Sequence, residues 1–148
     1  MRKFALLCCL PLLLTLCALA QSVEISGSYA HLTPGKDGFD FSAAYLATSH
    51  FGIEGDVGGY YPGQDSNHVY TALAGPKIMF STHHGLFTPF AHLLFGEARE
   101  FGNNYFAVLP GAGVDVGTKS IALRLKLDAL NSDSGTHARA GAGVVLRW

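Results

Sequence analysis

Apolar and polar residues alternate with a period of two through most of this chain. The alternation is clearest over the last eleven positions, where one face consists of Ala138, Ala140, Ala142, Val144, Leu146 and Trp148 and the other of Arg139, Gly141, Gly143, Val145 and Arg147. A period of two over about ten residues, with a thin apolar face and an aromatic end, is typical of a strand that crosses an outer membrane.

Turn-forming residues divide the preceding sequence into seven more segments of similar length. The expected strands are 23–32, 39–47, 52–61, 69–81, 87–98, 105–116, 121–130 and 138–148. No segment after residue 21 shows a sustained helical period, so we expect no helix there. An even number of strands of about ten residues predicts an all-β fold, an eight-stranded antiparallel up-and-down transmembrane β-barrel.

Three prolines qualify this pattern, because proline lacks the N–H group that a strand donates to its neighbour. Pro89 falls at the start of an expected strand, where it is tolerated. Pro76 and Pro110 fall inside expected strands, and they predict bulges or strand ends nearby.

The first twenty residues read as a cleavable signal peptide. Arg2 and Lys3 precede an apolar run over 4–16, and Ala18-Leu19-Ala20 offers a cleavage site before Gln21. All three cysteines, Cys8, Cys9 and Cys17, lie in this segment. Lipid attachment at Cys17 is the alternative, disfavoured because the preceding Leu14-Thr15-Leu16 puts a bulky residue where lipoprotein signals have a small one. We therefore divide the chain into a signal peptide, 1–20, and a barrel domain, 21–148.

The segment 21–148 contains no run of the ~18–20 apolar residues that a membrane-spanning helix needs. A protein of this composition that crosses a membrane must do so as a closed barrel, since only closure satisfies every backbone group. The formal net charge of −1 indicates no nucleic-acid surface. These features predict the outer membrane of a Gram-negative-type bacterium.

Charged residues occupy the face opposite the apolar one. Seven of them are expected to form a lumenal charge network: Glu54, Asp56, Lys77, Asp115, Arg124, Lys126 and Asp128. Side chains just fill the interior of an eight-stranded barrel, so such charges must be paired. We expect a packed network that plugs the lumen; the alternative, a proton or ion path, is disfavoured by the narrow bore. His92 is expected to join it, although Glu97 and Arg99 have the opposite parity on the same segment.

Aromatic residues gather near the ends of the expected strands, as the interfacial girdles of a membrane barrel do. They are Tyr29, Phe39, Tyr45, Phe51, Tyr60, Tyr61, Tyr70, Phe80, Phe87, Tyr105, Phe106 and Trp148.

Other residues suggest chemistry only weakly. His83-His84, in a turn expected on the periplasmic side, lacks further metal ligands nearby. His137, Ser134 and Asp133 share one loop, whereas a catalytic triad needs a base oriented by a separate partner. Gly111-Ala112-Gly113 is followed by no helix that would make it a dinucleotide site. We expect no catalytic, cofactor-binding or metal site.

Several short segments resemble the small OmpA/OmpX-type outer-membrane barrels, in particular the uncharacterised "outer membrane protein beta-barrel domain" group. They are Val23–Tyr29, Ala74–Lys77, Thr88–His92 and the terminal aromatic strand. The resemblance implies insertion by the barrel-assembly machinery, which recognises a final strand ending in an aromatic residue, here Trp148. It implies no activity, because a fold does not determine a function.

The sequence favours a non-enzymatic barrel with a structural or surface-interaction role in the envelope. Its expected partners are outer-membrane lipid and, during insertion, the assembly machinery; we expect a monomer without a cofactor. Two alternatives remain: a membrane-embedded enzyme of the lipid A deacylase type, and a soluble periplasmic lipocalin-like barrel. The second alternative would place apolar residues inside and polar residues outside.

Overall fold

A computed structural model describes residues 22–62, 68–80 and 86–148. The expected signal peptide with its cysteines, and His83-His84, lie outside these residues. In the described ranges, no helix is long and apolar enough to cross a membrane. Eight strands are present: β1 (Ser22–Leu32), β2 (Lys36–Leu46), β3 (Phe51–Pro62), β4 (Val69–Met79), β5 (Phe87–Glu100), β6 (Asn103–Gly117), β7 (Ile121–Ser132) and β8 (Gly135–Arg147).

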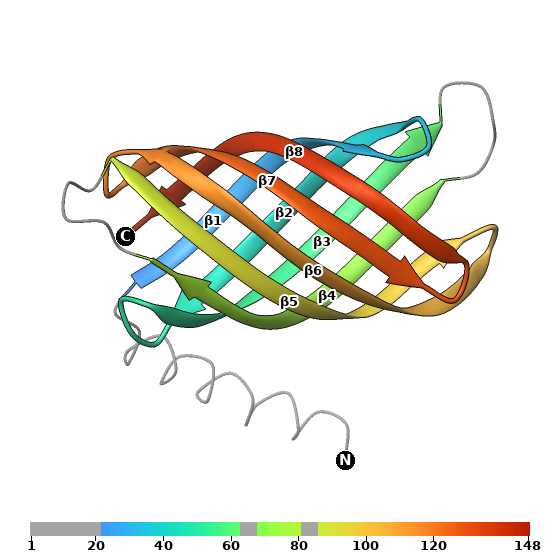
Figure 1. Cartoon of the computed structure of the whole chain (residues 1–148), viewed down its shortest axis with the longest axis horizontal. Coiled ribbons are helices and arrows are strands. Elements are labelled where there is room, and N and C mark those ends of the chain that lie inside the picture. The colour runs from blue at the N-terminus through green and yellow to red at the C-terminus, as the bar shows by residue number, and fades with distance from the viewer. Residues whose placement is uncertain (1–21, 63–67, 81–85) are drawn as a thin grey trace, which may run out of the picture.

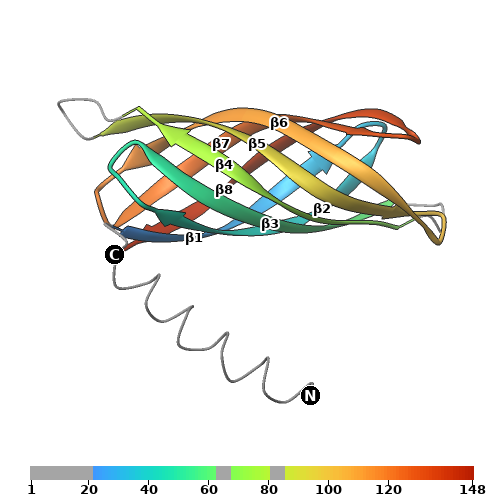
Figure 2. The same ribbon diagram turned by 90° about the horizontal axis from the view of Figure 1, so that it is seen from below.

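The strands form one closed barrel in which every strand pairs with its neighbours in sequence (Figures 1 and 2). Antiparallel pairing of β1 with β8, from Glu24–Arg147 to Leu32–Arg139, closes it. We call the end where β1 begins and β8 ends the near end. The opposite end, which carries the β1–β2, β5–β6 and β7–β8 turns, is the far end. The expected all-β barrel is confirmed.

The two faces of each strand have opposite chemistry. On β7, Leu127 is 70% exposed on the outside, whereas the adjacent Lys126 is 3% exposed and points into the lumen. The same holds on β3, where Ile53 and Val57 face outward and Glu54 and Asp56 are buried. An apolar exterior around a charged interior is the arrangement that a lipid environment stabilises.

Outward aromatic side chains gather towards both ends of the apolar band. Phe51, Phe80, Phe87 and Trp148 lie towards the near end, and Tyr29, Phe39, Tyr61, Tyr70 and Phe106 towards the far end. Tyr60 is an exception to the expected girdle: it is fully buried and faces the lumen. Neighbouring strand residues point to opposite faces, so only one of Tyr60 and Tyr61 can face lipid.

Buried apolar side chains lie on both sides of the charged middle of the lumen. Towards the far end lies one buried cluster: Ala30, Leu32, Tyr60, Val69, Leu73, Leu94, Ala98, Ala107, Leu109 and Leu130. Towards the near end, Leu46, Met79 and Phe90 form a second cluster. The interior is therefore layered along the barrel axis, with charges between two apolar layers.

The prediction of bulges or strand ends at Pro76 and Pro110 is wrong. Ala74 pairs with Phe95 and Lys77 with His92, so both strands advance by three residues and none is inserted. The β6–β7 ladder likewise keeps its register past Pro110. Pro76 pairs with Ile53 on β3, and Pro110 pairs with Leu93 on β5. On the other side of each proline the ladder is interrupted. The missing N–H donor is thus accommodated by a local gap in the pairing.

The far-end hairpins are longer than the alternation predicts. The expected turns at 33–38, 100–104 and 131–137 shrink, because β2 begins at Lys36, β5 ends at Glu100, β6 begins at Asn103 and β8 begins at Gly135. Backbone hydrogen bonds continue past the apolar band, where the side chains are polar and the alternation of hydrophobicity disappears.

Candidate functional site

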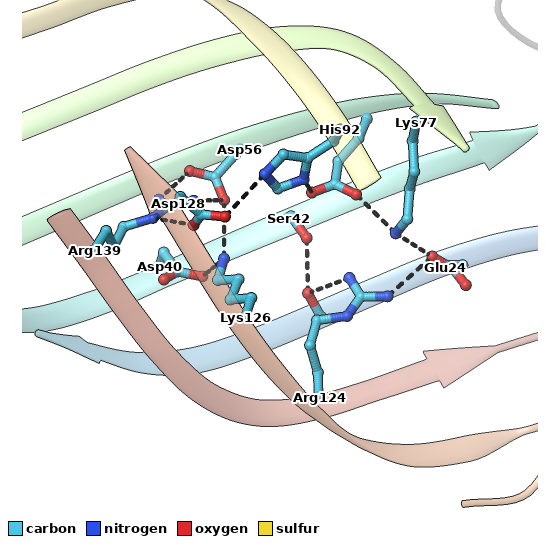
Figure 3. Close-up of polar contacts among 12 residues, drawn as sticks. Glu24, Asp40, Ser42, Asp56, Lys77, His92, Arg124, Lys126, Asp128 and Arg139 are labelled. Carbon is cyan, nitrogen blue, oxygen red and sulfur yellow. Dashed lines mark hydrogen bonds and ion pairs between the residues drawn. The ribbon is translucent and has the colours of Figure 1, made fainter. Parts of the chain in front are cut away.

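The charged interior is organised around two arginines, of which Arg124 on β7 serves the near half. Its guanidinium donates two hydrogen bonds to Asp115 on β6, each at 2.8 Å, and one to Glu24 on β1 at 3.2 Å. Lys77 on β4 donates to Glu24 at 2.6 Å and lies 2.7 Å from Glu54 Oε2. Arg147 contacts both Glu24 and Asp115. Among these contacts, Lys77–Glu24 and Arg124–Glu24 join strands that are not neighbours in the barrel, as Figure 3 shows for Lys77 and Glu24.

Arg139 on β8 organises the second half of the network. Its Nε donates to Asp128 at 2.6 Å, and its Nη1 donates to Asp56 at 2.8 Å and to the Tyr60 hydroxyl at 2.9 Å. Lys126 Nζ donates to Asp40 Oδ1 at 2.6 Å and to Asp56 Oδ2 at 3.4 Å. Arg139 is 1% exposed. A buried charge of this kind is tolerated only because its partners satisfy it.

His92 on β5 links the two halves (Figure 3). Its Nε2 lies 3.1 Å from Asp128 Oδ1, and its Nδ1 lies 3.2 Å from Glu54 Oε1. The Nδ1 contact has the distance of an ion pair but not the geometry of a hydrogen bond. Gly111 makes room for this link, since a Cβ there would stand 2.0 Å from Asp128 Oδ1 and 2.4 Å from His92 Nε2.

Charge in the described part of the network is nearly balanced. Its carboxylates are those of Glu24, Asp40, Glu54, Asp56, Asp115 and Asp128, and its lysines and arginines are Lys77, Arg124, Lys126, Arg139 and Arg147. That makes six carboxylates against five permanent cations, so a doubly protonated His92 would make the network neutral. Each of the six carboxylates lies within 3.0 Å of a lysine or arginine nitrogen.

All seven residues of the sequence-predicted network lie inside the barrel. Each of them contacts at least one oppositely charged side chain. His92 also faces the lumen, while Glu97 and Arg99 are exposed on the outer face. The predicted set of seven did not include Glu24, Asp40, Arg139 and Arg147. The alternation already placed Arg139 and Arg147 on the side of the charged lumen, and Glu24 and Asp40 have the same inward parity, which is the signal that would have found them.

A smaller polar cluster lies at the far end, beyond the apolar layer. Lys36 on β2 donates to Glu100 on β5 at 2.5 Å, across the lumen. Ser134 donates to the same carboxylate at 3.1 Å, and His137 Nε2 lies 4.0 Å from it. Glu100 therefore lies between Ser134 and His137. In a catalytic triad the histidine lies between the other two residues, with a hydrogen bond to the serine on one side and to the carboxylate on the other. The arrangement ties three hairpins together rather than activating Ser134.

Metal and cofactor chemistry finds little support in the interior. In the part of the chain that the structure describes, no group of three or more histidine, cysteine, aspartate or glutamate side chains is arranged to hold a metal ion. Gly111, Ala112 and Gly113 lie within β6, in a continuous strand without a helix behind it. The network's chemistry is thus mutual neutralisation of buried charge.

Comparison with known proteins identifies the architecture. The chain is similar to the N-terminal β-barrel domain of Pseudomonas aeruginosa OprF, with 19% identity and a TM-score of 0.69 over 87% of this chain and 98% of that one. It is also similar to Ail, the attachment invasion locus protein of Yersinia pestis, with 15% identity and a TM-score of 0.59 over 86% and 97% of the two chains.

An enzyme shares this architecture more distantly. The outer membrane enzyme PagL matches with 9% identity and a TM-score of 0.50 over 83% of this chain and 98% of that one. No protein-family model and no curated protein sequence matches the chain. At these identities the likeness concerns the fold, which is that of the small OmpA/OmpX-type eight-stranded outer-membrane barrels.

Proposed function

We propose that this chain is a non-enzymatic outer-membrane barrel with a structural or surface-interaction role in the envelope, and that side chains plug its lumen. The observation that carries the proposal is the layered interior, in which two apolar clusters enclose a charge network whose six carboxylates each lie within 3.0 Å of a lysine or arginine nitrogen. Such an interior leaves the outer surface and the far-end hairpins as the parts available to partners.

The proposed location combines the expected signal peptide, the apolar outer band and the likeness to outer-membrane barrels. We place the near end on the periplasmic side and the far end outside, as a monomer surrounded by outer-membrane lipid. The lipocalin-like alternative requires an apolar lumen and a polar exterior, and the facing of Leu127 and Lys126 opposes it.

The enzyme alternative lacks a specific supporting contact. A lipid A deacylase-type mechanism needs a serine activated by a histidine. The candidates Ser134 and His137 each approach Glu100, and among the described residues they make no hydrogen bond to one another. We therefore propose no catalysis for this chain.

Reconstitution into planar lipid bilayers tests the plugged lumen. The account predicts no stepwise conductance under conditions in which an open porin in the same bilayers conducts, because paired side chains occupy the bore. Reproducible unitary steps that track the amount of protein, in preparations free of porin, would contradict it.

Trp148 is proposed as the signal read by the barrel-assembly machinery. Its backbone pairs with Val23 through hydrogen bonds of 2.9 and 3.2 Å, while its ring is 66% exposed and makes little contribution to the core. The variant Trp148→Ala keeps the backbone pairing. It is expected to lower the amount of barrel assembled in cells several-fold, while protein refolded in detergent unfolds at nearly the wild-type urea concentration. Normal assembly in cells would show that the ring is not the signal.

A further inference from the structure

The outer face carries a hollow framed by aromatic rings near the far end. It has a volume of about 420 Å³ and is lined by Phe39, Phe41, Val57, Gly59, Tyr61 and Tyr70 from β2, β3 and β4. Its lining is predominantly apolar, and its aromatic side chains are 47–61% exposed. Membrane barrels carry such rings where hydrocarbon meets the polar headgroups.

Gly59 lies in the lining of this hollow, between two of its aromatic residues. Gly59 lies directly between Phe39 on β2 and Tyr70 on β4 in the cross-strand pairing. A Cβ there would lie 3.3 Å from the Tyr61 hydroxyl and 3.6 Å from the Tyr70 ring, so a larger side chain would occupy the space between the rings. No positive backbone angle at Gly59 requires a glycine. Gly59 therefore contributes no side chain of its own to the hollow, and the Tyr61 and Tyr70 rings stand beside it.

A cation lies on the strand next to the hollow, beside Tyr70. Arg99 on β5 is the cross-strand partner of Tyr70, so Phe39, Gly59, Tyr70 and Arg99 form one outward row. Among the described residues, Arg99 forms no ion pair, not even with Glu97, which shares its outward face on β5. An unpaired guanidinium beside an apolar hollow at the membrane surface suits a phosphate with an attached acyl chain.

A second hollow on the outer face provides an internal contrast. It has a volume of about 480 Å³ and is lined by residues of β6, β7, β8 and β1. Several of these are small, among them Ala112, Ala140 and Ala142. The only charged side chain in its lining is Lys126, whose ammonium is turned inward onto Asp40. Chemistry that selects a phosphate is thus present at the first hollow and absent from the second.

We propose that the hollow at Gly59 binds one phosphorylated, acylated lipid of the outer leaflet, of the lipid A type, with an acyl chain between the rings and a phosphate on Arg99. This assignment rests on the proposed outer-membrane location and on the placement of the far end outside. It is independent of whether the lumen conducts.

Native mass spectrometry of the purified barrel in detergent, titrated with lipid A, tests the proposal. Gly59→Leu fills part of the hollow and Arg99→Gln removes the cation. Each is expected to weaken lipid A binding about tenfold, the first by excluding the acyl chain and the second by loss of one charge-assisted contact. Ala142→Leu, in the second hollow, is one matched control and should bind as the wild type does. Glu97→Gln, which removes a carboxylate from the same outward face of β5, is the other and should bind at least as tightly as the wild type, because a like charge near the phosphate is lost. Migration of unheated samples on a gel verifies that each variant is folded.

Two further probes separate the sources of the signal. Dephosphorylated lipid A should bind wild type and Arg99→Gln equally, and phosphatidylglycerol should bind more weakly than lipid A. Equal lipid A binding by all four variants, or loss of binding in Ala142→Leu as large as in Gly59→Leu, would overturn the site. Tighter binding of phosphatidylglycerol would overturn the assignment to lipid A.

Discussion

Replacing Arg124 with alanine is expected to lower the free energy of unfolding by about 3–5 kcal/mol, the usual cost of removing one partner from a buried ion pair. Arg124 is 1% exposed and donates to both Asp115 and Glu24, so its loss weakens the neutralisation of two buried carboxylates at once. Urea titration of the refolded barrel in detergent micelles measures the change.

A double variant identifies the physical cause of that loss. Removing Asp115 together with Arg124 takes away one stranded carboxylate, so Asp115→Ala with Arg124→Ala should be more stable than the sum of the single changes predicts. Arg99→Ala, on the outer face, is the control for loss of an arginine and should shift stability by only about 0.5 kcal/mol or less. Equal losses at positions 99 and 124 would show that the buried network contributes little.

The variant Gly143→Ala is expected to prevent closure of the barrel. Gly143 on β8 faces inward at the seam with β1, and a Cβ there would stand 2.2 Å from the Gly27 carbonyl oxygen and 2.5 Å from the Ser28 Cα. Both are backbone atoms of β1, the strand that must pair with β8 for the barrel to close. Rotation of a side chain therefore cannot relieve the overlap. Loss of the compact, fast-migrating band in unheated samples on a denaturing gel would report the defect.

Gly55→Ala is the matched control for this substitution. Gly55 lies on the outward face of β3, and the nearest atom to a Cβ there, the Leu73 carbonyl oxygen, is 4.0 Å away. The variant should close normally and match or slightly exceed the wild-type stability, because alanine loses less backbone entropy than glycine. If Gly143→Ala closes as readily as Gly55→Ala, the seam is more open than the structure describes.

Alternation along the strands was sufficient to predict the fold and the facing of most side chains. On β7, every second residue from Ile121 to Ala129 is apolar and was assigned to the outer face, and Arg124, Lys126 and Asp128 between them were assigned to the lumen. The structure places them in this way. Period-two patterns carry this information because each residue commits its neighbours to the opposite face.

The specific ion pairs were beyond the reach of this pattern. Lys77 meets Glu24 and Arg139 meets Asp56 across the lumen, between strands that do not adjoin. Such meetings depend on strand tilt and stagger around the whole barrel, which alternation within single strands does not specify. Glu24 and Asp40 have inward parity, but the lysines that they meet could not be predicted from it, and neither could the close approach at Gly143.

The central claim is that a membrane-spanning barrel holds its charges inside and its apolar residues in lipid. Cell fractionation, followed by electrophoresis of boiled and unboiled samples, tests it most directly. The account predicts protein in the outer-membrane fraction whose mobility changes on heating. A soluble periplasmic protein with the same mobility before and after boiling would contradict it.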